Sequence, residues 1–342
     1  MRFFCLTLVG IAVMVTAAAA AEPGRRYDLV ARASEIDKAA GAHPEIGFPF
    51  SDPKTGKPAD LEHAVVDTSV PSQGRLVIWL MAHNAELFDR IAGYGLHGIQ
   101  VHYANRWFGT LKPAVRDAGD VLGKIRLEAA TGEDVSPQVA IPKADSMRER
   151  ARQFLLWLDH QNSAGSWSQF LTDDHSDVRW DKVTLAGISH GSTTAARFAM
   201  HQSVDRVVMF SGPRDNTETW QGGPSATAPN RFFGFSHVLD TGWEQDHYCR
   251  SWQLLRMNEC GPLVNVEQAI PPYGNSRRLI SDCDMGGSSR RAHSGVIPGG
   301  NACKDAEGNY LHEPVWRYLF MHPPDQVGVA VPPDTDCEMT PH

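Results

Sequence analysis

The chain has 342 residues, of which 42% are hydrophobic and 21% are charged, and its formal net charge at pH 7 is −8. An acidic chain without clustered lysine and arginine lacks the surface that nucleic-acid binding requires, so we expect no nucleic-acid partner. The length suits one α/β domain with a large core, and two domains are possible.

The N-terminus has the pattern of a secretory signal peptide: an early arginine, an apolar stretch and an alanine run that ends at Ala21. The alternative is a membrane anchor. However, the strongly apolar part, Phe3 to Val15, is shorter than the roughly 20 residues that span a bilayer. We therefore expect residues 1–21 to be removed. Residues 22–342 then form a single secreted or periplasmic domain that does not insert into a membrane.

Strands and helices are expected to alternate after an irregular lead-in over residues 22–60 and before a tail over 323–342. Apolar runs bounded by proline or glycine predict buried strands, and apolar residues at helical spacing predict amphipathic helices. The expected strands are 62–67, 75–82, 98–103, 181–187, 205–212, 231–240 and 276–282. The expected helices are 86–95, 144–161, 192–202 and a last one that begins near residue 312. This order predicts a mostly parallel sheet with helices on both faces.

Residues 93–98, Gly-Tyr-Gly-Leu-His-Gly, match the glycine spacing of a dinucleotide-binding loop. Such a loop follows a strand and opens a helix, whose N-terminus holds the pyrophosphate. Here the segment follows an expected helix and precedes an expected strand, so we interpret it as a helix end and a turn. The cysteines have no C-x-x-C spacing and the histidines are scattered, so we expect neither a cofactor nor a metal.

Residues 187–191, Gly-Ile-Ser-His-Gly, lie between an expected strand and an expected helix. A tight strand-to-helix turn of this form holds a serine in unfavourable backbone angles with its hydroxyl exposed. Gly187 and Gly191 are needed because side chains there would collide with the neighbouring strand and helix. The alternative is an ordinary serine in a glycine-rich loop, but the setting favours Ser189 as a nucleophile.

A serine nucleophile needs a histidine base and an acid that orients the base, in the chain order serine, acid, histidine. Asp240 ends the strand expected at 231–240, at the sheet edge where ligands gather. Its rivals are Asp215, Glu244 and Asp246, each of which is otherwise a solvated loop carboxylate.

His293 is the preferred base because it lies in an expected loop after the strand at 276–282. The other candidate bases after the serine are His237, His247, His312, His322 and His342. For the oxyanion hole, the backbone N–H of His190 is the expected first donor. The second donor is expected from Ala82 or His83, with Asn84 as a further alternative.

Five cysteines follow the expected leader, and export favours disulfides. Cys283 and Cys303 stand ten residues to either side of His293, and we predict a bond that holds the loop carrying this base. The second predicted pair is Cys249 with Cys260. This pairing leaves Cys337 unpaired.

Several segments resemble a branch of exported bacterial α/β-hydrolases over roughly residues 75–320. These segments are LEAATGEDVSP, ADSMRERARQFLLWL, GSWSQFL, RWDKVTLAGISHGS, VVMFSGPRD, FFGFSHVLD and AHSG followed by PVWRYLF. The resemblance implies the α/β-hydrolase fold and a triad of Ser189, Asp240 and His293. The segment WLMAHNAELF departs from many such enzymes because it lacks their H-G-G glycines. The resemblance does not specify a substrate.

The sequence therefore predicts an exported serine hydrolase, in the simplest case a carboxylic-ester hydrolase acting on a small-molecule or polymer-borne ester. A peptidase or lipase of the same fold is an alternative, and a binding protein without turnover is another. Residues 104–143 and 212–230 are expected to border the site. Their Trp107, Phe108 and Trp220 form either an apolar rim or ordinary packing.

Overall fold

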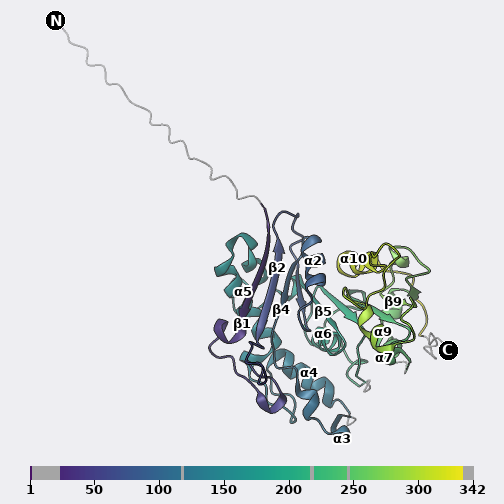
Figure 1. Ribbon diagram of the computed structural model, residues 1–342, viewed down its shortest axis with the longest axis horizontal. Helices are drawn as coiled ribbons and strands as arrows, with labels where there is room; N and C mark the ends of the chain where they lie inside the picture. The colour runs from purple at the N-terminus through teal and green to yellow at the C-terminus, as the bar shows by residue number, and fades with distance from the viewer. Residues whose placement is uncertain (2–23, 117–118, 216–218, 245–246, 334–342) are drawn as a thin grey trace.

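The computed structural model of the protein describes Met1 and residues 24–333, except 117–118, 216–218 and 245–246 (Figure 1). Its strands are β1 (Arg26–Arg32), β2 (Leu61–Asp67), β3 (Leu76–Trp79), β4 (His97–Gln100), β5 (Val183–Ile188), β6 (Arg206–Phe210), β7 (Phe232–His237), β8 (Leu263–Asn265) and β9 (Arg278–Ser281). Its α-helices are α1 (Ala33–Ile36), α2 (Ala85–Gly93), α3 (Pro113–Arg116), α4 (Val121–Thr131), α5 (Met147–Gln161), α6 (His190–His201), α7 (Thr241–Glu244), α8 (His247–Leu254), α9 (Ser289–Gly295) and α10 (Glu313–Met321).

Within the described residues, the nine strands form one sheet in the order β1-β2-β4-β3-β5-β6-β7-β9-β8. The pairs β1–β2 and β2–β4 are antiparallel, and the other neighbouring strands are parallel. The carboxyl ends of β5, β6 and β7 therefore meet at one edge of the sheet. This mostly parallel sheet with helices on both faces is the α/β-hydrolase fold, so the predicted fold class is confirmed.

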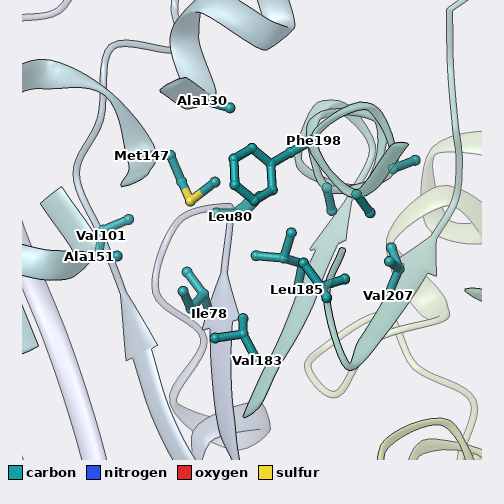
Figure 2. Close-up of a cluster of buried hydrophobic side chains, with 14 of the residues drawn as sticks. Ile78, Leu80, Val101, Ala130, Met147, Ala151, Val183, Leu185, Phe198 and Val207 are labelled. Atoms are coloured by element: carbon teal, nitrogen blue, oxygen red, sulfur yellow. The ribbon is translucent and has the colours of Figure 1, made fainter. Parts of the chain in front are cut away.

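The hydrophobic core has two layers because successive side chains of a buried strand point to opposite faces. On β3, Ile78 belongs to the layer under α4, α5 and α6, and Trp79 belongs to the layer under α2 and α10. Figure 2 shows the first layer, where Phe198 of α6 and Met147 of α5 lie over side chains of β3 and β5. On the opposite face, Arg90 of α2 contacts Glu313 of α10 at 2.7 Å.

The expected elements lie close to the observed ones, including the turn over residues 93–98 that joins α2 to β4. The prediction that residues 22–60 are irregular is wrong, because β1 pairs with β2 over its whole length. Tyr27, Leu29 and Ala31 alternate along this strand and pack on the core. The apolar but exposed Val30 lies between Leu29 and Ala31 and hides the alternation in so short a run.

Helix α4 lies in a segment for which no helix was predicted. Nine of its residues are buried, among them Arg126 and Glu128. A helix that is buried on nearly all sides has no polar face, so its sequence lacks the amphipathic period. Among the described residues, α4 included, no helix is long and apolar enough to span a membrane.

Candidate active site

Ser189 forms the turn between β5 and α6 by itself. Its backbone angles are φ 58° and ψ −121°, which are unfavourable for any residue with a side chain. β5 ends at Ile188 and α6 begins at His190, so no other residue takes part in the turn. The serine is 9% exposed at the carboxyl edge of the sheet. This is the geometry that the sequence predicted for a nucleophile.

The turn is tight because β5 and α6 touch beside it. A Cβ atom at Gly187 would lie 2.4 Å from the Gly191 carbonyl carbon and 2.6 Å from the Ser192 nitrogen. A Cβ atom at Gly191 would lie 2.4 Å from the Leu80 oxygen. All these neighbours are backbone atoms that cannot move aside, so both positions require glycine.

Asp240 follows β7 and is fully buried. Its Oδ2 lies 2.7 Å from Nδ1 of His293, and its Oδ1 accepts a hydrogen bond from the Gly242 N–H at 3.1 Å. The Tyr248 hydroxyl lies 3.3 Å from both carboxylate oxygens. Burial alone would raise the pKa of Asp240, but the hydrogen bond and charge of His293 and the Gly242 N–H hold it below its usual value. Asp240 is therefore a carboxylate at neutral pH.

His293 lies on the short helix α9, so the prediction that it lies in a loop is wrong. The Ser288 hydroxyl caps this helix by accepting from the Arg291 N–H at 3.3 Å. Because a carboxylate only accepts hydrogen bonds, the Nδ1–H of His293 donates to Asp240. The other ring nitrogen, Nε2, is then left with a lone pair when the imidazole is neutral.

Hydrogen bonds to the end of β6 bring α9 and the serine to the same sheet edge. The Ser211 hydroxyl donates to the His293 carbonyl at 2.8 Å, and the Ser189 N–H donates to the Phe210 carbonyl at 3.0 Å. Phe210 ends β6 and Ser211 is the next residue. Within the described residues, Ser189 Oγ makes no hydrogen bond with His293. Instead, Ser189 Oγ accepts a long hydrogen bond from Nη1 of Arg214, at 3.5 Å.

Asp215, the nearest rival for the acid, pairs with another partner. It forms a buried ion pair with Arg126 at 2.6 Å, in which the two side chains are 2% and 1% exposed. Its Oδ2 also accepts from the Trp220 indole at 3.2 Å. Asp246 and the side chain of Glu244 lie outside the described residues.

Three of the other candidate bases have described side chains, and each holds a structural hydrogen bond. Nε2 of His237 lies 2.8 Å from the Cys283 carbonyl, and Nε2 of His322 lies 2.9 Å from the Gln326 carbonyl. Nε2 of His312 lies 2.9 Å from Glu267. His342 and the side chain of His247 lie outside the described residues.

His190 is exposed, and its ring lies beside Phe108 and Arg126. Desolvation by these neighbours and then the charge of Arg126 lower the pKa of His190 to about 4, so its ring is neutral at pH 7. Its backbone N–H begins α6, where the sequence places the first oxyanion donor. For the second donor, the segment after β3 passes beside Gly191. A Cβ atom built at Gly191 would lie 2.8 Å from Cγ of Met81, which belongs to this segment. Ala82 and His83 follow directly, and the choice between them stays a prediction.

The three aromatic residues expected near the site divide into two groups. Trp107 and Trp220 are 1% and 4% exposed and pack around the Arg126–Asp215 pair, which is ordinary packing. Phe108 is half-buried, and its ring centroid lies 3.8 Å from that of His190. Of the three, only Phe108 can form part of a rim.

Cys283 and Cys303 are joined by a disulfide, with 6.6 Å between their Cα atoms. The predicted pair of Cys249 with Cys260 is wrong, because Cys260 is a buried free thiol and Cys249 is bonded elsewhere. Residues near Cys260 pack instead against the C-terminal segment, where the Gly328 N–H donates to the Cys260 carbonyl at 3.2 Å. Cys337 lies outside the described residues.

One group of possible metal ligands occurs among the described residues: Glu267, Cys283 and His312. The Cys283 sulfur is part of the disulfide, so it is not available as a thiolate. The group therefore does not supply the three ligands that a zinc site needs.

Solved structures similar to this chain include three hydrolases. A putative dienelactone hydrolase from Klebsiella pneumoniae subsp. pneumoniae is 13% identical over 76% of this chain and 87% of its own, with a TM-score of 0.33. A ferulic acid esterase from Streptomyces cinnamoneus is 12% identical over 70% and 73%, with a TM-score of 0.34. An α/β serine hydrolase without a lid from Xanthomonas campestris is 10% identical over 66% and 79%, with a TM-score of 0.31. No protein-family model matches the chain, and no curated protein does.

Gly187→Ala tests the tight turn. The added methyl group would collide with backbone atoms of α6, so we expect a melting temperature lower by several degrees and at least a tenfold loss of activity. Gly93→Ala is the matched control, because it lies in α2 with no neighbour within 4 Å. The control should keep or slightly raise the melting temperature, since alanine favours a helix. Equal melting temperatures and activities for the two variants would show that the turn at Ser189 does not require glycine at position 187.

Cys303→Ser tests the support of α9. The bond closes a loop with a sequence separation of 20 residues, and in the chain-entropy model its loss costs about 3 kcal/mol of stability. Ala292 of α9 packs on Cys283 and on Leu239, the neighbour of Asp240, so we also expect a lower kcat. Cys260→Ala, which removes a free thiol, is the control. Denaturant unfolding and kcat would be measured for both, and an unchanged kcat for Cys303→Ser would show that the bond does not position His293.

Proposed function

We propose that the protein is a serine hydrolase that cleaves carboxylic esters through Ser189, His293 and Asp240. The observation that carries the proposal is the buried Asp240 carboxylate bonded to His293 at the same sheet edge where Ser189 is held at positive φ. A strained serine and an imidazole oriented by a buried acid are the parts that nucleophilic acyl transfer requires. In this proposal the substrate is a small-molecule or polymer-borne ester.

In the proposed reaction, Nε2 of His293 takes the proton of the Ser189 hydroxyl as Oγ bonds to the ester carbonyl carbon. The backbone N–H of His190 and one from the segment after β3 stabilise the oxyanion. The imidazolium then gives its proton to the leaving alcohol, and the C–O bond to that alcohol breaks. Water repeats the sequence on the acyl-enzyme and releases the acid. Asp240 stays ionised and stabilises the imidazolium throughout.

A peptidase or lipase of the same fold is the alternative within this mechanism, since a fold does not fix a substrate. A protein that only binds its ligand is the alternative outside it. We also propose that the protein acts outside the cytoplasm. The signal-like N-terminus and the Cys283–Cys303 disulfide support this location.

Ser189→Ala should fold normally and lose ester hydrolysis by a factor of about 10³ or more, because no other group supplies the nucleophile. Turnover would be measured with a panel of p-nitrophenyl esters, aryl esters, polyesters and peptides. Ser294→Ala is the control, since this serine lies beside His293 on α9. Its hydroxyl donates to the Arg290 carbonyl at 3.2 Å and accepts from the Asn301 side chain at 2.7 Å, so it is bonded away from the site. Ester hydrolysis by Ser189→Ala at the wild-type rate would refute the proposal.

Asp240→Asn should lower kcat by up to about 10⁴-fold, because the imidazole loses its charged partner and its correct tautomer. The pKa of Asp240 lies below its usual value, so the wild-type carboxylate is charged over the whole neutral range. The deficit should therefore persist from about pH 6 to about pH 9. Asp282→Asn, an exposed acid next to the end of β9, is the control. A less than tenfold fall in kcat for Asp240→Asn would mean that another acid orients His293.

A further inference from the structure

Arg214 brings a positive charge to the nucleophile. It lies in the segment after β6, it is half-buried, and its guanidinium Nη1 is 3.5 Å from Ser189 Oγ. No carboxylate among the described residues forms an ion pair with it. The two acids near this edge are already paired, Asp215 with Arg126 at 2.6 Å and Asp240 with His293 at 2.7 Å.

The position of Arg214 is fixed from both sides. Its backbone N–H donates to the Thr193 hydroxyl at 2.9 Å, and that hydroxyl donates to the Ser189 carbonyl at 2.9 Å. The next residue, Asp215, is anchored by the buried ion pair with Arg126. The backbone of the arginine is thus tied to the backbone of the serine. A group held in this way is preorganised for a ligand at the serine.

A guanidinium is charged at every working pH, and a partly buried cation without an anionic partner is unfavourable. Arginine forms bidentate hydrogen bonds with planar carboxylates, at about 2.7–2.9 Å. A carboxylate bound to Arg214 would thus lie within roughly 6 Å of Ser189 Oγ. One or two carbons between a scissile carbonyl and a second carboxylate span this distance.

We propose that Arg214 is a substrate-binding residue that selects esters whose acyl group carries a carboxylate one or two carbons from the scissile carbonyl. The substrates are then monoesters of short dicarboxylic acids, and the products are the dicarboxylate and an alcohol. This inference rests on the proposed function, because it takes the scissile carbonyl to lie at Ser189. A guanidinium that only stabilised the oxyanion would instead favour every ester equally.

The test compares monoethyl succinate with ethyl 4-oxopentanoate, in which a methyl ketone replaces the carboxylate at nearly the same size. Released ethanol gives kcat/KM for the wild type, Arg214→Met and Arg214→Lys. We expect the wild type to prefer the anionic ester by about 10- to 100-fold, the range of a charge-assisted pair. Arg214→Met should remove this preference, because it should lower kcat/KM for the anionic ester at least about tenfold more than kcat/KM for the neutral ester. Arg214→Lys should restore the preference in part, because lysine keeps the charge but not the fork.

Arg290→Met is the matched control, because Arg290 is an exposed arginine on α9 that makes no contact with Ser189. It should leave the preference unchanged. An equal loss on both esters in Arg214→Met, or no preference in the wild type, would overturn the inference.

Binding to the Ser189→Ala protein separates this inference from the proposed function. Calorimetry with the Ser189→Ala protein should show that monoethyl succinate binds more tightly than ethyl 4-oxopentanoate. This difference in affinity should disappear in the Ser189→Ala, Arg214→Met double variant. If the wild type hydrolyses neither these two esters nor any ester of the panel but this binding difference appears, the proposed function fails and the anion site stands. Equal binding of the two esters would refute the anion site, whatever the wild type hydrolyses.

Discussion

The close approach of β5 to α6 is the constraint on which the site depends. Gly187 on the strand and Gly191 on the helix leave no space for a side chain, so the chain reverses through Ser189 alone. A residue at φ 58° in this position persists only because the surrounding packing holds it there. The strain therefore fixes where the hydroxyl points. The other polar groups of the site are arranged around this fixed point.

Because β5, β6 and β7 pair in parallel, these groups lie at the same edge of the sheet. β6 and β7 follow β5 in the sheet order, so the residues after each strand lie side by side at their carboxyl ends. Ser211 and Arg214 come after β6, and Asp240 comes after β7. The buried Arg126–Asp215 pair then holds the segment after β6 against α6 through hydrogen bonds from Arg126 to Thr194 and to the His190 carbonyl. A buried pair contributes little net stability, but removing one partner leaves an uncompensated charge. The Arg126–Asp215 pair instead fixes the position of the segment after β6.

The sequence was sufficient for those parts of the structure that rest on local pattern. The buried strands, the glycine spacing at 187–191 and the order of serine, acid and histidine are all short-range signals, and Asp240 and His293 do come into contact. The helix α4 was missed because its charged residues are buried and erase the amphipathic period. Arg126 and Asp215 are 89 residues apart, so nothing local links them. The pairing of Cys249 failed for the same reason, because disulfide connectivity is set by tertiary packing. One local feature does indicate Arg214: it is a charged residue just after β6, the strand next to β5, which leads to Ser189.

The central claim is that Ser189 is a nucleophile activated by the protein around it. Its most direct test is covalent labelling of the folded wild-type protein with a fluorophosphonate, followed by intact-mass measurement and peptide mapping. The account predicts one adduct per chain, located at Ser189 in the peptide that contains Gly-Ile-Ser-His-Gly. The adduct should be absent when the protein is unfolded before labelling, because the reactivity comes from the turn at Ser189 and from His293. No adduct on the folded protein, or an adduct at a different residue, would contradict the account.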